Sequence, residues 1–156
     1  MTIAVSEATA ALYQDVIIDH GRRPRNFGDL PDATCTVEAV NPLCGDELTL
    51  HLKFEDGIIS AVTFEGSGCA ISQASASLMT GALKGMGTAE ALALFGRVHT
   101  MLTVEHDEQT PVPDVGKLAV LSGVWQYPTR VKCATLAWQA LRRALDEQSN
   151  ETEQTP

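Results

Sequence analysis

Positive charge is scarce in this sequence. Its 156 residues include 11 lysines and arginines against 20 aspartates and glutamates, so the formal net charge is −9 and the sequence pI is about 4.8. Proteins that bind nucleic acids normally present a basic face, and this balance argues against a nucleic-acid partner. The basic residues that are present gather at 22–25 and at 142–143. We expect a solvated turn or a partner-facing loop at the first cluster, and a solvated helix end at the second.

The sequence also lacks an apolar run that could cross a membrane. Residues 66–83 carry no charge, but six serine, threonine and glutamine side chains interrupt them, which is too many for a membrane span. The first residues have no basic start followed by an apolar run, so no signal peptide is expected. We therefore expect a cytoplasmic protein without a membrane partner. In that compartment, four cysteines indicate metal ligands or reactive thiols rather than disulfides.

The hydrophobic content is sufficient for one domain. A chain of 156 residues, 44% of them hydrophobic, can bury a core that needs no disulfide to fold. We predict that residues 1–150 form this domain and that residues 151–156 form a disordered polar tail.

Hydrophobic periodicity predicts an α+β fold. The predicted elements, in chain order, are a helix over 8–20, strands over 35–39, 48–52 and 58–64, a helix from residue 69, a helix over 89–101, a loop over 106–116 and a helix from residue 128. Glu55-Asp56-Gly57 between the last two strands is a hairpin signal. We therefore expect a three-stranded antiparallel sheet packed against helices on one face.

Three cysteines stand at junctions of these predicted elements. Cys44 and Asp46 are separated by one glycine, so in extended backbone the thiolate and the carboxylate point the same way. Cys69 follows a Gly-Ser-Gly turn at a predicted helix N-terminus, where unpaired N–H groups and the helix dipole favour a thiolate. Cys133 lies one to two turns into the last helix. Three sulfurs and one carboxylate suit a tetrahedral Zn²⁺ ion.

The spacing alone leaves a second interpretation open. No two cysteines form a C-x-x-C pair, and free cysteines are often inert residues of the core. Cys35 alternates with apolar inward positions, and we expect it to be such a core thiol. Among the histidines, we expect His20 to cap a helix end. The other three, at positions 51, 99 and 106, are expected at the surface.

Four stretches of the chain carry a resemblance to a known family. They are LYQDVIIDHGRRPRNFG from residue 12, NPLCGDEL around Cys44, FEGSGCAISQASASLM around Cys69 and YPTRVKCATLAW around Cys133. Together they resemble the U-type iron–sulfur cluster assembly family, whose fold is SufE/NifU-like, and within it the SufU branch. The resemblance implies that Cys44, Asp46, Cys69 and Cys133 bind one Zn²⁺ ion per chain.

The final motif distinguishes two branches of that family. IscU-type scaffolds carry His-Cys there, whereas this chain has Lys132-Cys133. Resemblance to SufU implies a zinc-dependent sulfurtransferase that accepts persulfide sulfur from a SufS-type, pyridoxal-phosphate-dependent cysteine desulfurase, with SUF scaffold proteins downstream. The acceptor thiolate would be Cys44, released when the partner supplies a replacement ligand. Arg130 and Lys132 would offset thiolate charge or pair with Asp46, unless they are simply solvated.

Two other functions remain compatible with the sequence. One is a scaffold that assembles a [2Fe–2S] cluster on the same ligands. The other is an inert, zinc-stabilised adaptor for a desulfurase. A coloured cluster would identify the scaffold, and a persulfide on Cys44 would separate sulfur transfer from the adaptor.

Overall fold

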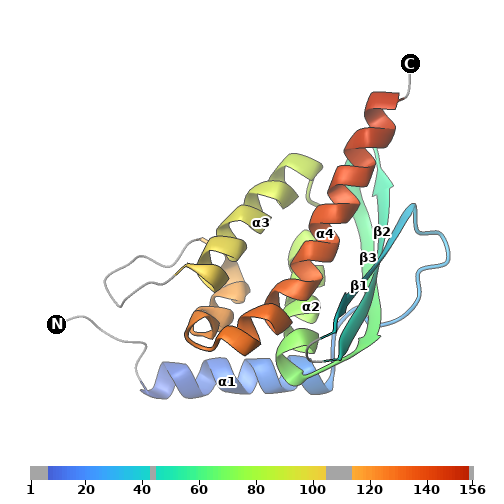
Figure 1. Cartoon of the computed structure of the whole chain (residues 1–156). Coiled ribbons are helices and arrows are strands. Elements are labelled where there is room, and N and C mark those ends of the chain that lie inside the picture. Colours follow the sequence, from blue (N-terminus) through green and yellow to red (C-terminus); the bar gives the residue numbers. More distant parts are fainter. Residues whose placement is uncertain (1–6, 43–44, 105–113, 155–156) are drawn as a thin grey trace.

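The computed structural model describes residues 7–42, 45–104 and 114–154. It contains a three-stranded antiparallel sheet with helices against one face (Figure 1). The elements are α1 (Glu7–Arg22), β1 (Cys35–Asn41), β2 (Asp46–Glu55), β3 (Ile58–Ser67), α2 (Ala70–Leu83), α3 (Thr88–Thr103), the 3₁₀ helices η1 (Gly116–Leu121) and η2 (Val124–Gln126), and α4 (Pro128–Gln154). The α+β class and the antiparallel sheet that the sequence predicted are confirmed.

The strand order β1-β2-β3 follows the chain, with β2 at the centre. Leu50 of β2 lies opposite Val37 of β1 and Phe64 of β3, and all three side chains are buried under the helices. The β2–β3 turn contains Asp56 and Gly57 at φ 54° and 77°, the left-handed conformation that a tight hairpin turn requires. A register shift between Lys53 and Phe54 then sets how the rest of β2 pairs with β3, and with it the residues that face the helices.

Two helices cover the inner face of the sheet. α4 packs across β1 and β2, while α2 packs against β3 and against α4. The hydroxyl of Ser75 in α2 donates to the carbonyl of Ala134 at 2.6 Å, and it accepts from Nε1 of Trp138 at 3.1 Å. All three groups are buried, so this pair of hydrogen bonds joins α2 and α4 close to Cys133. In Figure 1, α3 lies beside α4, and α1 runs below the lower ends of α2 and α4.

The loop between α1 and β1 is attached to both α2 and β3. His20 Nδ1 lies 2.7 Å from the hydroxyl of Ser77, which also accepts from the backbone N–H of Arg25 at 2.8 Å. The N–H of Gly28 donates to the carbonyl of Phe64 at 2.9 Å, and the N–H of Phe64 donates to the carbonyl of Asn26 at 3.0 Å. Residues 26–28 therefore pair with β3 like a short additional strand.

Some boundaries differ from those predicted. α4 continues to Gln154, past the expected domain limit at residue 150. The division into a domain and a tail stays a prediction. Most of the loop expected over 106–116 lies outside the described residues. Within the described part of the chain, no helix is both long and apolar enough to cross a membrane.

Candidate metal centre

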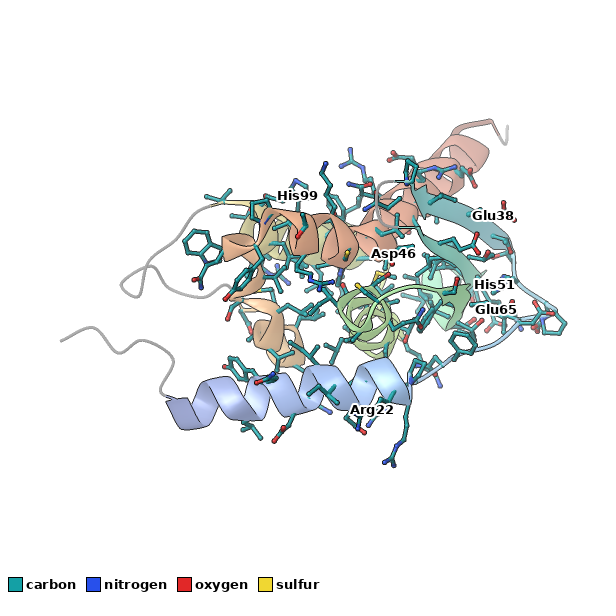
Figure 2. All side chains as sticks on the ribbon, turned by 60° about the horizontal axis from the view of Figure 1, so that its bottom comes forward. Arg22, Glu38, Asp46, His51, Glu65 and His99 are labelled. Carbon is teal, nitrogen blue, oxygen red and sulfur yellow. The ribbon has the colours of Figure 1, made fainter. Side chains whose placement is uncertain are left out.

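Asp46 is a buried carboxylate at the start of the central strand. Its side chain is 1% exposed and faces the helices; Figure 2 shows it between the sheet and α4. Oδ1 accepts from the backbone N–H of Cys69 at 3.0 Å, and Oδ2 lies 3.9 Å from the Cys69 sulfur, which donates to it. A buried carboxylate is costly unless it is paired with donors or a cation, and these contacts direct it toward a thiol.

Cys69 is the N-cap residue of α2, as the Gly-Ser-Gly turn before it predicted. Its backbone is extended, at φ −71° and ψ 168°, and its sulfur accepts from the N–H of Ser72 at 3.5 Å. N–H groups at a helix N-terminus carry partial positive charge. The half-buried sulfur is therefore held between the N-terminus of α2 and the Asp46 carboxylate.

Cys133 comes from α4, which packs beside α2 on the same face of the sheet. It lies in the second turn of α4, is 3% exposed, and its thiol donates to the carbonyl of Thr129 at 3.5 Å. The Ser75 hydrogen bonds join α2 to α4 at the residue that follows Cys133. The distance between Cys69 and Cys133 consequently depends on how these two helices pack.

Two glycines allow the turn before α2 to approach β2. A Cβ atom on Gly68 would lie 2.6 Å from Oδ1 of Asp46, and one on Gly66 would lie 2.2 Å from the carbonyl oxygen of Glu47. Gly66 also has φ +147°, a conformation that other residues rarely adopt. The Gly-Ser-Gly turn is therefore a steric requirement of the Asp46–Cys69 contact.

These elements bring Asp46, Cys69 and Cys133 together. One oxygen and the two sulfurs all lie within 4.8 Å of one another. In a tetrahedral zinc site with Zn–S bonds of about 2.3 Å, neighbouring ligands are roughly 3.8 Å apart, so small side-chain movements would close the three around one ion. Two soft thiolates and a carboxylate fit zinc. The fourth predicted ligand, Cys44, lies outside the described residues, and its part in the site stays a prediction.

The remaining cysteine is separate from this group. Cys35 packs at the rim of the core, half-buried, with its thiol 3.4 Å from Oε2 of Glu147 in α4. It is therefore less enclosed than the core thiol that the sequence predicted, because β1 begins at this residue, at the edge of the sheet.

Arg130 and Lys132 are exposed in the first two turns of α4. Lys132 lines a surface hollow together with Val40 and Pro42. The roles expected for both cations stay predictions. In the basic loop, Arg25 forms a 2.6 Å ion pair with Asp19, and all three arginines of the loop are exposed.

The prediction for His51 was wrong. It was expected at the surface but is 7% exposed, because the loop that precedes β1 covers this part of the outer sheet face. His20 contacts Ser77 of α2 instead of capping a helix end. Burial lowers its pKa, with Arg25 adding to the effect. His99 is exposed, as predicted, and stacks on Phe95 within α3.

The fold and the buried thiol–carboxylate group define a small α+β protein with a candidate metal centre at one end of its sheet. Residues 12–134 match the family described as NifU-like N terminal domain. The chain belongs to this family, which comprises the IscU and SufU proteins.

Relatives of the chain carry both names. The chain is 42% identical over 135 residues to the zinc-dependent sulfurtransferase SufU of Bacillus subtilis, covering 86% of this chain and 89% of the relative. It is 41% identical over 139 residues to the iron–sulfur cluster assembly scaffold protein IscU of Streptococcus pyogenes, covering 89% and 86%. A crystal structure of a candidate SUF-system scaffold protein, SufU of Fervidobacterium islandicum, superposes with a TM-score of 0.76 at 36% identity, covering 88% of this chain and 98% of that one.

Proposed function

We propose that this protein is a zinc-dependent sulfurtransferase of iron–sulfur cluster assembly. It would accept persulfide sulfur from a pyridoxal-phosphate-dependent cysteine desulfurase of the SufS type and pass it to downstream SUF scaffold proteins. The observation that carries the proposal is the buried group of Asp46, Cys69 and Cys133. The 42% identity to a protein named as a zinc-dependent sulfurtransferase supports it.

The donor set favours zinc over a resident cluster. Within the part of the chain that the structure describes, the group around Asp46 contains no histidine, and Lys132 stands where the resemblance places the histidine of IscU-type scaffolds. An ammonium group cannot replace imidazole as a cluster ligand. When bound, zinc would hold the cysteines as thiolates and stabilise the fold around them.

Three of the residues would hold the zinc ion, and the fourth would transfer sulfur. Cys69 and Cys133 are held by the N-terminus of α2 and by the second turn of α4, and Asp46 by the N–H of Cys69. These three are fixed on regular elements. Cys44 is the residue assigned to transfer. Its thiolate would attack the outer sulfur of the desulfurase persulfide, the S–S bond would break, and the desulfurase cysteine would leave as a thiolate. The sulfur then remains on Cys44 as a new persulfide.

Mass spectrometry of the zinc-loaded chain after reaction with a cysteine desulfurase and L-cysteine tests the proposal. We expect one additional sulfur on the peptide that contains Cys44, and no transfer in Cys44→Ser because a hydroxyl is a far poorer nucleophile and holds no persulfide. Cys35→Ser is the matched control, since Cys35 lies outside the group, and it should transfer sulfur and retain zinc like the unmodified chain.

The scaffold is the second candidate, because the identity to a protein named IscU is nearly as high. Asp46→Ala separates the two functions. In a sulfurtransferase this variant should bind zinc more weakly and transfer sulfur more slowly. If Asp46→Ala instead accumulates a stable coloured cluster with iron and sulfide, and Cys44→Ser still stimulates the desulfurase fully, sulfur transfer is wrong and the scaffold function replaces it.

A further inference from the structure

The outer face of the sheet carries a second group of metal-ligating side chains. His51 of β2, Glu65 of β3 and Asp29 of the preceding loop each offer one ligand atom, and these atoms lie within 4.8 Å of one another. Figure 2 shows His51 and Glu65 together on the side of the sheet opposite to Asp46. From this geometry we propose that these three residues form a binding site for a first-row divalent transition-metal ion, separate from the Asp46–Cys69–Cys133 centre.

The imidazole of His51 is buried and oriented at both nitrogens. Nε2 lies 2.8 Å from Oε1 of Glu65 and 3.8 Å from Oδ1 of Asp29. On the other side of the ring, Nδ1 lies 3.1 Å from the hydroxyl of Thr36. Because a carboxylate only accepts, the 2.8 Å contact places a proton on Nε2. A metal ion bound between the two groups would replace that proton, and Nδ1–H would then donate to Thr36. A hydrogen bond at the second nitrogen is the usual support of a metal-ligating histidine.

Backbone pairing positions the three ligands. His51 lies opposite Thr63 in the β2–β3 register, so Glu65 is its diagonal neighbour on the same face. Asp29 follows the segment that pairs with β3, where the N–H of Gly28 donates to the carbonyl of Phe64. Each ligand therefore comes from a chain segment whose place in the sheet is fixed by hydrogen bonds, and only the two carboxylate side chains need to adjust.

The site is closed at the imidazole and open at the carboxylates. The side chains of Glu65 and Asp29 are 45% and 69% exposed, so an ion can enter from solvent. Glu65 also lines a surface hollow shared with Glu38 and Glu47, and this acidic lining raises the local concentration of cations. Beside His51, the buried hydroxyl of Thr63 has no hydrogen-bond partner among the described residues. Water bound to an ion would give the hydroxyl a partner.

The ligand chemistry determines the class of ion. Ca²⁺ and Mg²⁺ prefer sites made only of oxygen, whereas an imidazole nitrogen with two carboxylates suits Mn²⁺, Fe²⁺ or Zn²⁺. The thiolates of the first centre favour a softer ion such as Zn²⁺ over Mn²⁺. Mn²⁺ therefore reports on the outer site without displacing zinc from the cysteines. The inference does not depend on sulfur transfer, and either proposal can fail without the other.

The test is a titration of the zinc-loaded full chain with Mn²⁺, in which electron paramagnetic resonance measures the concentration of free Mn²⁺ at each step. We expect one bound Mn²⁺ per chain that excess Mg²⁺ does not displace. His51→Gln, Glu65→Gln and Asp29→Asn should each weaken binding by about tenfold or more. Glu38→Gln is the matched control, because it removes one charge from the same face and no ligand, and its affinity should stay within about twofold of the unmodified chain.

A second measurement does not depend on the folding of any variant. In the unmodified chain, bound Mn²⁺ should broaden the ¹H–¹⁵N signals of the His51 imidazole before those of His99, which lies exposed on α3. The inference is overturned if the chain binds no Mn²⁺, or if His51 is not the histidine that broadens. It is also overturned if Glu38→Gln weakens binding as much as Glu65→Gln does, since the attraction would then come only from the charge of the face.

Discussion

Replacing Gly68 by alanine should disrupt the centre through steric conflict alone. The added Cβ would lie 2.6 Å from Oδ1, 3.0 Å from Cγ and 3.3 Å from Cβ of Asp46. Distances under 3.0 Å do not occur between a Cβ and such atoms, so the carboxylate or the turn must move. Asp46 is 1% exposed and has no solvent to retreat into. We therefore expect the hydrogen bond from the N–H of Cys69 to Oδ1 to be lost.

The loss of stability follows from the separation of the Asp46 carboxylate from the N–H of Cys69. A hydrogen bond to a charged acceptor contributes about 1.5–3 kcal/mol, and a buried acceptor without its donor loses at least as much. We expect Gly68→Ala to lower the free energy of unfolding of the metal-free chain by about 2 kcal/mol, which corresponds to roughly 4–8 °C in Tm for a chain of this size. Zinc affinity should fall as well, because the displaced carboxylate is one of the three ligands brought together.

Thermal unfolding with and without zinc, together with competition against a chelator, measures both effects. Gly81→Ala is the matched control, because Gly81 lies inside α2 with nothing within 4 Å of the added Cβ. Alanine is favoured over glycine in a helix by up to about 1 kcal/mol, so this variant should be slightly more stable and bind zinc normally. A Gly68→Ala chain that equals Gly81→Ala in stability and zinc affinity would refute the steric argument.

Two further predictions concern the packing around the centre. Burial lowers the pKa of His20 in the folded chain below its usual 6.5. As the pH falls through 6.5, the unfolded chain therefore binds more protons at this residue than the folded chain does, and the free energy of unfolding decreases. His20→Gln should flatten the dependence of Tm on pH between about 7.5 and 5.5, and an unchanged slope would contradict the assignment. Ser75→Ala would leave Nε1 of Trp138 buried without its acceptor; we expect a loss of about 1–3 kcal/mol in denaturant unfolding, and an unchanged midpoint would show that the hydroxyl does not join the helices.

Local signals were sufficient to predict the fold. The alternation of apolar residues in the strands and the Glu55-Asp56-Gly57 turn correspond to β1, β2, β3 and their hairpin. The change to a helical period after residue 68 marks α2, whose N-cap is Cys69. These features depend on residues that are close together in the sequence, so hydrophobic periodicity predicts them.

The candidate site was predictable only in part. That Asp46, Cys69 and Cys133 meet depends on the packing of α2 against α4 through Ser75 and Trp138, which no spacing in the sequence reveals. The resemblance to a known family supplied that information instead. The sequence predicted a Gly-Ser-Gly turn before Cys69, but not that the missing Cβ of Gly68 makes room for a carboxylate.

His51 shows why the outer group was missed. Alternation along β2 correctly predicts that His51 lies on the face away from the core, but that face is not exposed at this position. The loop over 26–34 then covers that face, through the hydrogen bonds between Phe64 and residues 26 and 28. The β2–β3 register that makes Glu65 the diagonal neighbour of His51 includes a shift between Lys53 and Phe54, which the hairpin turn alone does not predict.

The central strand connects the two groups. In β2, Asp46 points toward the helices together with Leu48 and Leu50, while His51 lies on the opposite face. Because side chains alternate along a strand, a slip of one residue would turn Asp46 outward, His51 inward and the leucines into solvent at once. The register that buries the core is thus the same register that forms both groups of ligands. An ion bound at either group would therefore stabilise the same pairing of β2 with its neighbours, even though the two groups lie on opposite faces of the sheet.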